Sequence, residues 1–300
     1  MATTTEPPGR SPADDGDLAE LEAGLDALES FSTPRISLLT RLRRSVLPPA
    51  VAVLLFLGIW QLVWALHVKA DWLLPSPAET WREAAGSWSQ WDVGTAVFNS
   101  VYRGLSGFAV AMLIGTPIGL TVWRFRVVRT SLGPILSGLQ NLPSVAWVPI
   151  GILWFGISPA TIYMVVLVGA VPSIAIGVVS GLDQVPPLYL QVGRNLGARG
   201  FSAARYILLS AAAPGYLAGL KQGWAFAWRS LMAAELIAVA PQLGPGLGQL
   251  LEQGRNNTDA GQSFTAILLI FLAGIGINAL IFAPLERRIL RDRGLTGRRA

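Results

Sequence analysis

The chain has 300 residues, of which 52% are hydrophobic and 14% are charged, and its formal net charge is +5. Soluble chains carry about 25% charged residues, so this composition indicates a membrane protein. Cysteine is absent and His67 is the only histidine, which excludes disulfides, cysteine chemistry, paired-histidine metal sites and histidine-based triads. We expect no cofactor and no metal.

Residues 1–34 hold eight acidic side chains and one basic side chain. A charged segment with few aromatic residues cannot bury enough apolar surface to fold, so we expect a solvated, largely disordered tail. Its acidity, and its length before the first apolar run, argue against a signal peptide. We predict that residues 1–46 form a cytoplasmic tail ending in a basic cluster, Arg35, Arg41, Arg43 and Arg44.

Runs of about 20 apolar residues recur along the rest of the chain, the length that a helix needs to cross about 30 Å of hydrocarbon. The sequence therefore predicts an all-α polytopic membrane protein with about six transmembrane helices. The predicted spans are about 47–66, 96–123, 132–155, 160–182, 215–240 and 263–284. They form a membrane domain, 47–284, which is followed by a basic cytoplasmic tail, 285–300.

Small residues at four-residue spacing line two of these spans and predict close contact between helices. They are Ala111, Gly115 and Gly119 in the second span and Gly215, Gly219 and Gly223 in the fifth.

The third span is broken by Pro143 and Pro149. Irregular backbone at membrane depth is tolerated mainly where it lines a cavity. The polar and aromatic side chains of this span are therefore candidates for a translocation pathway, although each tryptophan also fits plain packing or an interfacial anchor. They are Gln140, Asn141, Trp147 and Trp154.

Two ionisable side chains, Arg229 and Glu235, fall deep in the fifth span. Charge at the centre of a membrane helix costs about 3 kcal/mol and usually marks function or pairing. Six residues correspond to about 240° after whole turns, so the two side chains do not share a face. Either one lines the pathway, where an arginine suits an anion, or they form salt bridges between helices. Arg103 and Lys221 lie nearer the span ends, and we expect them to extend to the membrane surfaces.

The basic residues outside the spans divide 16 to 3 between the two sides of the predicted topology. The richer side includes the 183–214 segment and both tails, and the poorer side holds Lys69, Arg82 and Arg255. Because cytoplasmic loops carry the excess of lysine and arginine, both termini and the 183–214 segment are predicted to be cytoplasmic. Because membrane topology accounts for the basic residues, their excess does not indicate nucleic-acid binding.

The 183–214 segment is the only long polar stretch in the apolar second half of the chain. Pro187 can open a helix, because proline loses no hydrogen bond in a first turn. Leu188, Val192 and Leu196 then recur every four residues on one helical face.

A glycine follows this first helix. Gly197 permits a chain reversal at φ > 0, and Ser202 can cap a second short helix that carries Ala204, Arg205 and Leu208. Two short amphipathic helices in a basic segment either dock into the groove of a soluble partner or lie on lipid headgroups.

The segment resembles the cytoplasmic "EAA" loop in the permease subunits of ATP-binding-cassette (ABC) importers. The pattern of that family is Glu-Ala-Ala, three residues, Gly, nine residues, Ile, one residue and Leu-Pro. Gly197, Ile207 and Leu209 match the pattern, whereas Gln191, Val192, Gly193 and Ser210 depart from it.

Three more stretches, 99–120, 139–158 and 218–237, look like the branch of this family that handles aliphatic sulfonates, taurine and nitrate. The resemblance covers about residues 50–285 and implies a type I importer permease fold in the bacterial inner membrane. It implies assembly with two ATPase subunits, an extracytoplasmic binding protein and a second permease subunit. We expect a homodimer, because one chain supplies only six spans and one docking segment. The residues that it implies for ATPase coupling are Leu188, Gln191, Val192, Arg194, Leu196, Gly197, Ala198, Phe201 and Arg205.

The chain has no phosphate-binding loop of its own, because neither of its lysines, Lys69 and Lys221, follows a glycine. A partner ATPase must drive transport, or an ion gradient if the chain is a secondary transporter. The spans hold a single acid, Glu235, so we expect a non-catalytic subunit rather than a membrane enzyme. Aliphatic sulfonates are the first expectation for the substrate, and taurine, nitrate, bicarbonate or a vitamin precursor are the alternatives.

Overall fold

The computed structural model describes residues 38–70, 73–86, 93–239 and 243–291. The predicted acidic tail and the last residues of the basic tail lie outside these ranges. The chain divides into two units, Met1–Ile59 and Trp60–Ala300. The regular elements of the described residues are all helices, with no strand among them, which confirms the predicted all-α class.

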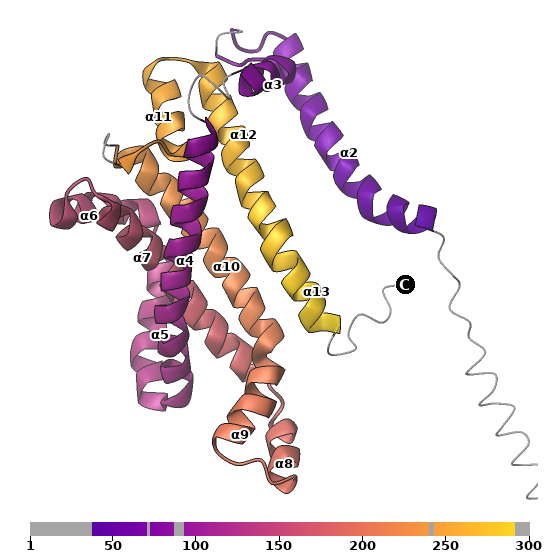
Figure 1. The fold of residues 1–300 in the computed structure, drawn as a ribbon, viewed down its shortest axis with the longest axis vertical. Helices are drawn as coiled ribbons and strands as arrows, with labels where there is room; N and C mark the ends of the chain where they lie inside the picture. Colours follow the sequence, from indigo (N-terminus) through magenta and orange to yellow (C-terminus); the bar gives the residue numbers. More distant parts are fainter. Residues whose placement is uncertain (1–37, 71–72, 87–92, 240–242, 292–300) are drawn as a thin grey trace, which may run out of the picture. The chain divides into compact units, whose positions relative to one another are not determined.

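Figure 1 labels most of these elements. In chain order they are α2 (Leu38–Ala65), α3 (Pro77–Gly86), α4 (Val93–Arg124), α5 (Arg126–Asn141), η1 (Ser144–Trp147), α6 (Val148–Phe155), α7 (Pro159–Asp183), α8 (Pro187–Asn195), α9 (Phe201–Ala203), η2 (Ala204–Leu208), α10 (Leu209–Ile237), α11 (Leu247–Asn256), α12 (Ala260–Ile277), η4 (Asn278–Phe282) and α13 (Ala283–Arg291). Within the second unit, α8 and α9 lie at one end, and α3 and α11 lie at the opposite end (Figure 1).

Four helical segments of the described chain are long and apolar enough to cross a membrane: Leu47–Ala65, Val93–Arg124, Pro159–Asp183 and Ala260–Arg291. A bent pair, Arg126–Asn141 with Ser144–Phe155, raises the number to five. The predicted fifth span lies in α10, which is not among them. Its 29 residues are sufficient for the length of a span. With Lys221, Arg229 and Glu235, however, α10 is too polar to be counted among the apolar spans.

The chain bends by 99° between α5 and the η1–α6 segment, at the first of the two prolines that were predicted to break the third span. Leu142 has an extended backbone (φ −75°, ψ 129°), the conformation that a following proline imposes. Pro149, in contrast, lies in the first turn of α6, where its missing N–H breaks no hydrogen bond. Pro143 therefore makes the bend, and Pro149 begins the next helix.

Helices α4, α7 and α10 form the packed centre of the second unit, and glycines set their closest contacts. A Cβ atom added at Gly177 of α7 would lie 2.4 Å from Cα of Gly219 in α10, and one added at Gly119 of α4 would lie 2.6 Å from the Ala175 carbonyl oxygen. The close packing predicted from the small residues of the second and fifth spans is confirmed.

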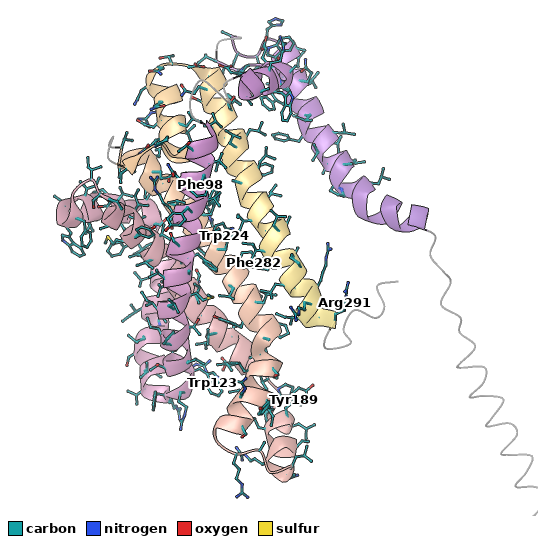
Figure 2. The ribbon with its side chains drawn as sticks, viewed as in Figure 1. Phe98, Trp123, Tyr189, Trp224, Phe282 and Arg291 are labelled. Carbon is teal, nitrogen blue, oxygen red and sulfur yellow. The ribbon has the colours of Figure 1, made fainter. Side chains whose placement is uncertain are left out.

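Aromatic side chains fill the space between α10 and the α4 and η4 segments. Trp224 stacks on Trp228 with ring centroids 5.7 Å apart, and Phe108 meets Trp224 edge-on at 5.6 Å. Trp224 and Phe282 lie side by side across α10 and η4 (Figure 2), with 6.4 Å between their centroids.

Candidate functional site

The segment predicted as a docking element folds as two short helices joined by a glycine turn. Helix α8 begins at Pro187 and ends at Asn195, and Gly197 adopts φ 86° as predicted. The Ala198 N–H donates to the Gly193 carbonyl (2.8 Å), and the Gly197 N–H donates to the Arg194 carbonyl (3.0 Å). These two bonds make a Schellman motif, which satisfies the last carbonyls of the helix.

A glycine–isoleucine contact locks the two short helices together. Gly193 is buried, and a Cβ atom placed on it would lie 1.9 Å from Cδ1 of Ile207 in η2. The Ile207 side chain therefore occupies the space that a side chain at position 193 would need. The departure of Gly193 from the Ala of the EAA pattern thus has a steric reason in this chain.

The outer face of α8 is apolar and uncovered. Leu188, Val192 and Leu196 are 60%, 48% and 82% exposed, and all three lie on one side of the helix. Tyr189 is also exposed, at the end of the unit where α8 lies (Figure 2). Exposed apolar side chains that form a contiguous face mark a surface for a partner or for lipid.

The other residues predicted for ATPase coupling surround this face. Gln191, Arg194 and Arg205 are exposed, and Ala198 is half-buried. Arg205 lies over the Tyr206 ring, 5.9 Å from its centroid. The placement of the Phe201 side chain lies outside the described part of the structure, although Phe201 begins α9.

The six residues predicted for the pathway are spread over α5, η1, α6 and α10, and no hydrogen bond or ion pair between described residues joins two of them. Gln140 donates to Ser173 Oγ of α7 at 2.9 Å. Asn141 is exposed at the end of α5. Trp147 packs half-buried against the main core, whereas Trp154 is exposed and meets Phe155 edge-on.

Glu235, near the end of α10, is the buried centre of a polar cluster. Its side chain is 0% exposed. Arg103 Nη1 of α4 lies 2.9 Å from Oε1, and Ser100 Oγ lies 2.7 Å from Oε2. The backbone N–H of Gly248 also donates to Oε2, at 3.2 Å. A carboxylate with this many donors is satisfied without water, as a buried charge requires.

The same cluster fixes the connection between α10 and α11. The Leu247 N–H donates to Ser100 Oγ at 2.9 Å, and Arg103 Nη2 donates to the Leu243 carbonyl. Next to it, Asn99 Nδ2 donates to the Pro245 carbonyl at 2.9 Å. The cluster therefore joins α4, α10 and residues 243–248 at one point.

The structure corrects the prediction for Arg103, which does not extend to the membrane surface. Its side chain turns into the protein and is 12% exposed, because the buried carboxylate of Glu235 needs a cation. No motif in the sequence selects Ser100. The four-residue spacing of Ser100 and Gly104 was the available signal that this face of α4 is packed. Lys221 also has a partner in the chain, Glu286, at 2.9 Å.

Arg229 and Glu235 differ completely in their surroundings, as their angular separation on α10 predicts. Arg229 is exposed and lies over Phe226, 4.6 Å from the ring centroid. Its Nε donates to the carbonyl of Ala225 at 3.1 Å. The exposed guanidinium is thus held against its own helix, with donors left for another group.

Comparisons with known proteins identify the family. The family model described as "Binding-protein-dependent transport system inner membrane component" matches residues 107–291. The chain is 27% identical to the nitrate import permease protein NrtB of Leptolyngbya laminosa, over 80% of this chain and 86% of that protein. It is 26% identical to the taurine transport system permease protein TauC of Escherichia coli (84% and 94% covered) and to the putative aliphatic sulfonates transport permease protein SsuC of Bacillus subtilis (83% and 87% covered).

A solved structure, titled as an inward-facing conformation of the MetNI methionine ABC transporter, has the same fold. The TM-score is 0.57 at 19% identity, and the match covers 67% of this chain and 97% of that chain. The predicted type I importer permease fold is confirmed by this likeness. The chain belongs to the family of binding-protein-dependent transport system inner membrane components, the permease subunits of ABC importers.

Proposed function

We propose that this permease subunit forms the translocation pathway for a small organic anion, with an aliphatic sulfonate as the substrate. The observation that carries the proposal is the exposed guanidinium of Arg229 on α10. Gln222, Ala225 and Arg229 are all exposed and lie three and four residues apart on one face of the helix. Gln222 and Arg229 thus form a polar stripe, with the small Ala225 between them.

A polar stripe on a membrane helix needs water or a second protein surface beside it. An arginine at the centre of a bilayer costs about 2.5–3.5 kcal/mol on insertion scales. The cost is relieved if the stripe faces a hydrated route between two permease copies. Arginine presents its donors in a rigid planar fork that suits an oxyanion.

The names of the relatives support an oxyanion as the transported group. Nitrate, taurine and aliphatic sulfonates each present negatively charged oxygens, and the three relatives are named after them. We choose the aliphatic sulfonates because a sulfonate joins such a group to an apolar chain. Nitrate is the second candidate, and taurine belongs with the sulfonates.

The proposed assembly has two permease copies, two ATPase subunits and an extracytoplasmic binding protein. The uncovered apolar face of α8 (Leu188, Val192 and Leu196) supports ATPase docking, because such a ridge fits a groove on a partner. The 16 to 3 division of basic residues supports a cytoplasmic position for both termini and for α8. Helices α3 and α11, at the other end of the second unit, are then available to the binding protein.

The test is uptake of a labelled alkanesulfonate into cells or vesicles that contain the complete transporter. Replacing Arg229 by Gln should lower uptake about 10- to 100-fold, because a hydrogen bond to a charged group is worth about 1.5–3 kcal/mol. Arg124→Gln is the matched control, since Arg124 also lies over a ring, 5.5 Å from the Phe125 centroid. Full uptake by the Arg229→Gln variant, at a normal membrane level, would show that Arg229 has no part in the pathway.

A further inference from the structure

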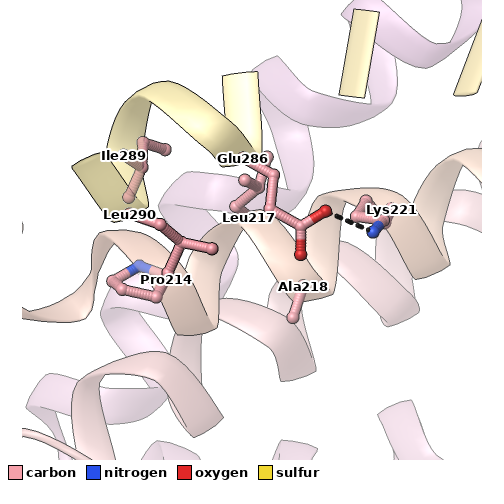
Figure 3. Close-up of a pocket in the computed structure, with 7 residues that line it drawn as sticks. All are labelled: Pro214, Leu217, Ala218, Lys221, Glu286, Ile289 and Leu290. Atoms are coloured by element: carbon pink, nitrogen blue, oxygen red, sulfur yellow. Dashed lines mark hydrogen bonds and ion pairs between the residues drawn. The ribbon is translucent and has the colours of Figure 1, made fainter. Parts of the chain in front are cut away.

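A small cavity lies between α10 and α13 and has mostly aliphatic walls. Its volume is about 190 Å³. Figure 3 shows one ion pair among the apolar groups, where Lys221 Nζ contacts Glu286 Oε2 at 2.9 Å. The lining residues are Pro214, Leu217, Ala218, Lys221, Glu286, Ile289 and Leu290.

The position of the cavity along α13 corresponds to the edge of the membrane. Leu280, Ile281 and Leu285 are exposed just before it, on the segment that is apolar enough to span. Arg287, the next residue after the cavity-lining Glu286, is exposed as well. An exposed apolar surface that changes to arginine within one turn marks the boundary between acyl chains and headgroups.

The ion pair leaves donors available for a ligand. An ammonium group has three donors, and Glu286 accepts one of those on Lys221. The Lys221 side chain is 35% exposed, so its remaining donors can reach a group at the mouth of the cavity. Arg287 adds a second cation about 100° around α13 from Glu286.

We propose that this cavity binds an anionic phospholipid of the adjacent leaflet, such as phosphatidylglycerol. One acyl chain lies along the aliphatic walls, and the phosphate accepts hydrogen bonds from Lys221 and Arg287. Basic pockets between membrane helices bind anionic headgroups in this way. A soluble anion does not fit as well, because most of the lining is apolar and the exposed surface beside it is apolar too.

A bound lipid adds to the connection between two helices that the Lys221–Glu286 ion pair already joins. Pro214 and Leu217 belong to the first turns of α10, directly after η2, and Ile289 and Leu290 belong to α13. The lipid therefore holds α13 against the end of α10 that is nearest to the 183–214 segment. Binding of this lipid does not depend on which substrate the permease transports.

The test is native mass spectrometry of the full chain, purified in mild detergent from membranes that contain phosphatidylglycerol and phosphatidylethanolamine. We expect a one-to-one complex with phosphatidylglycerol to survive delipidating washes. Ala218→Trp, which fills the cavity and leaves both charges in place, should abolish the complex, and Lys221→Gln should weaken it. Ala279→Trp is the matched control, because Ala279 is exposed in η4 outside the cavity.

The control should retain the lipid, and size-exclusion chromatography should show that all variants fold. Equal retention by the wild type and by Ala218→Trp would overturn the proposal, as would a wild type that retains no lipid. Preferential retention of phosphatidylethanolamine would also overturn it, because the site would then not select for negative charge. Excess glycerol 3-phosphate should not displace the lipid, whereas displacement would assign the site to a soluble phosphate.

Discussion

Glu235 of α10 and Arg103 of α4 form a salt bridge of 2.9 Å in which the carboxylate is completely buried. Removing one member of a buried ion pair leaves a charge without compensation, which costs about 3–5 kcal/mol. We therefore expect Glu235→Ala to lower the free energy of unfolding by that amount. The measurement is thermal unfolding of the purified chain in detergent.

A surface pair provides the control for this loss. Glu252 pairs with Arg255, whose side chain is 68% exposed, and exposed pairs contribute only about 0–1 kcal/mol. Arg255→Gln should therefore change stability little. Similar losses in both variants would contradict the structural role of the cluster around Glu235. Full stability of Glu235→Ala would contradict it as well.

Two glycines at the α7–α10 crossing allow the helix backbones to touch. A Cβ atom at Gly177 would meet the backbone of Gly219 at 2.4 Å, so Gly177→Ala must separate the helices. Overpacking of this kind costs about 1–3 kcal/mol, and we expect it as a lower unfolding temperature.

The control for Gly177 is Gly276, which has open space around it in α12. Alanine is favoured over glycine inside a helix by about 0.5–1 kcal/mol. Gly276→Ala should be neutral or slightly stabilising. An equal effect of the two substitutions would show that helix propensity, rather than the crossing, determines the outcome.

The contact between α3 and α12 should depend on pH. Burial, together with the charge of nearby Asp259, raises the pKa of Glu83 above 4.5. Glu83 lies over Gly261 in the first turn of α12, leaving no room there for a side chain. Because the folded state favours the protonated acid, the contact weakens as pH rises from 4.5 through the raised pKa.

Hydrogen exchange of the amides in 77–86, corrected for intrinsic rates, measures this dependence. Protection in the wild type should fall with rising pH, whereas Glu83→Gln should keep high protection because it carries no charge. The pKa of Glu79 shifts in the opposite direction, because hydrogen bonds from the backbone and side chain of Ser76 lower it. The hydrogen bond that the Ser76 N–H donates to the Glu79 carboxylate, at the start of α3, is therefore lost only at pH below 4.5. Measurements above about pH 5 therefore isolate Glu83. A pH-independent wild type would refute the assignment.

The sequence was sufficient for those features that depend on local chemistry. The proline break before Pro143, the positive φ of Gly197 and the close contacts of the small residues in α4 and α10 follow from covalent geometry and helix spacing. Most span positions follow from apolar length alone. Such features need no knowledge of which distant segments meet.

The features that the sequence did not reveal depend on contacts over long separations. Glu235 and Arg103 are 132 residues apart, and nothing in either helix specifies that they pair. The connection at residues 243–248, which completes the cluster, is a Gly-rich stretch without a recognisable pattern. Within the described part of the chain, five of the six expected spans are apolar enough to cross a membrane when the bent pair is counted. The remaining one, α10, carries Lys221, Arg229 and Glu235, of which Lys221 and Glu235 pair with residues distant in the sequence.

The residues proposed for coupling and for the pathway remain predictions. The structure favours α8 and Arg229 over the other candidates. Helix α8 has an exposed apolar face for a partner, and Arg229 has an exposed guanidinium for an anion. Trp147 and Gln140, in contrast, have partners inside the chain. We expect Gln140→Leu to affect the packing of α5 on α7 more than substrate selection.

The most direct test of the account is co-purification of the chain with its ATPase in detergent. Leu196→Asp changes the most exposed residue of the α8 face, at 82%, and Leu66→Asp is a control that is 65% exposed in another loop. The wild type and Leu66→Asp should retain the ATPase, and Leu196→Asp should lose it while still folding. Retention by Leu196→Asp, or no association with the wild type, would contradict the proposal that α8 couples this permease to ATP hydrolysis.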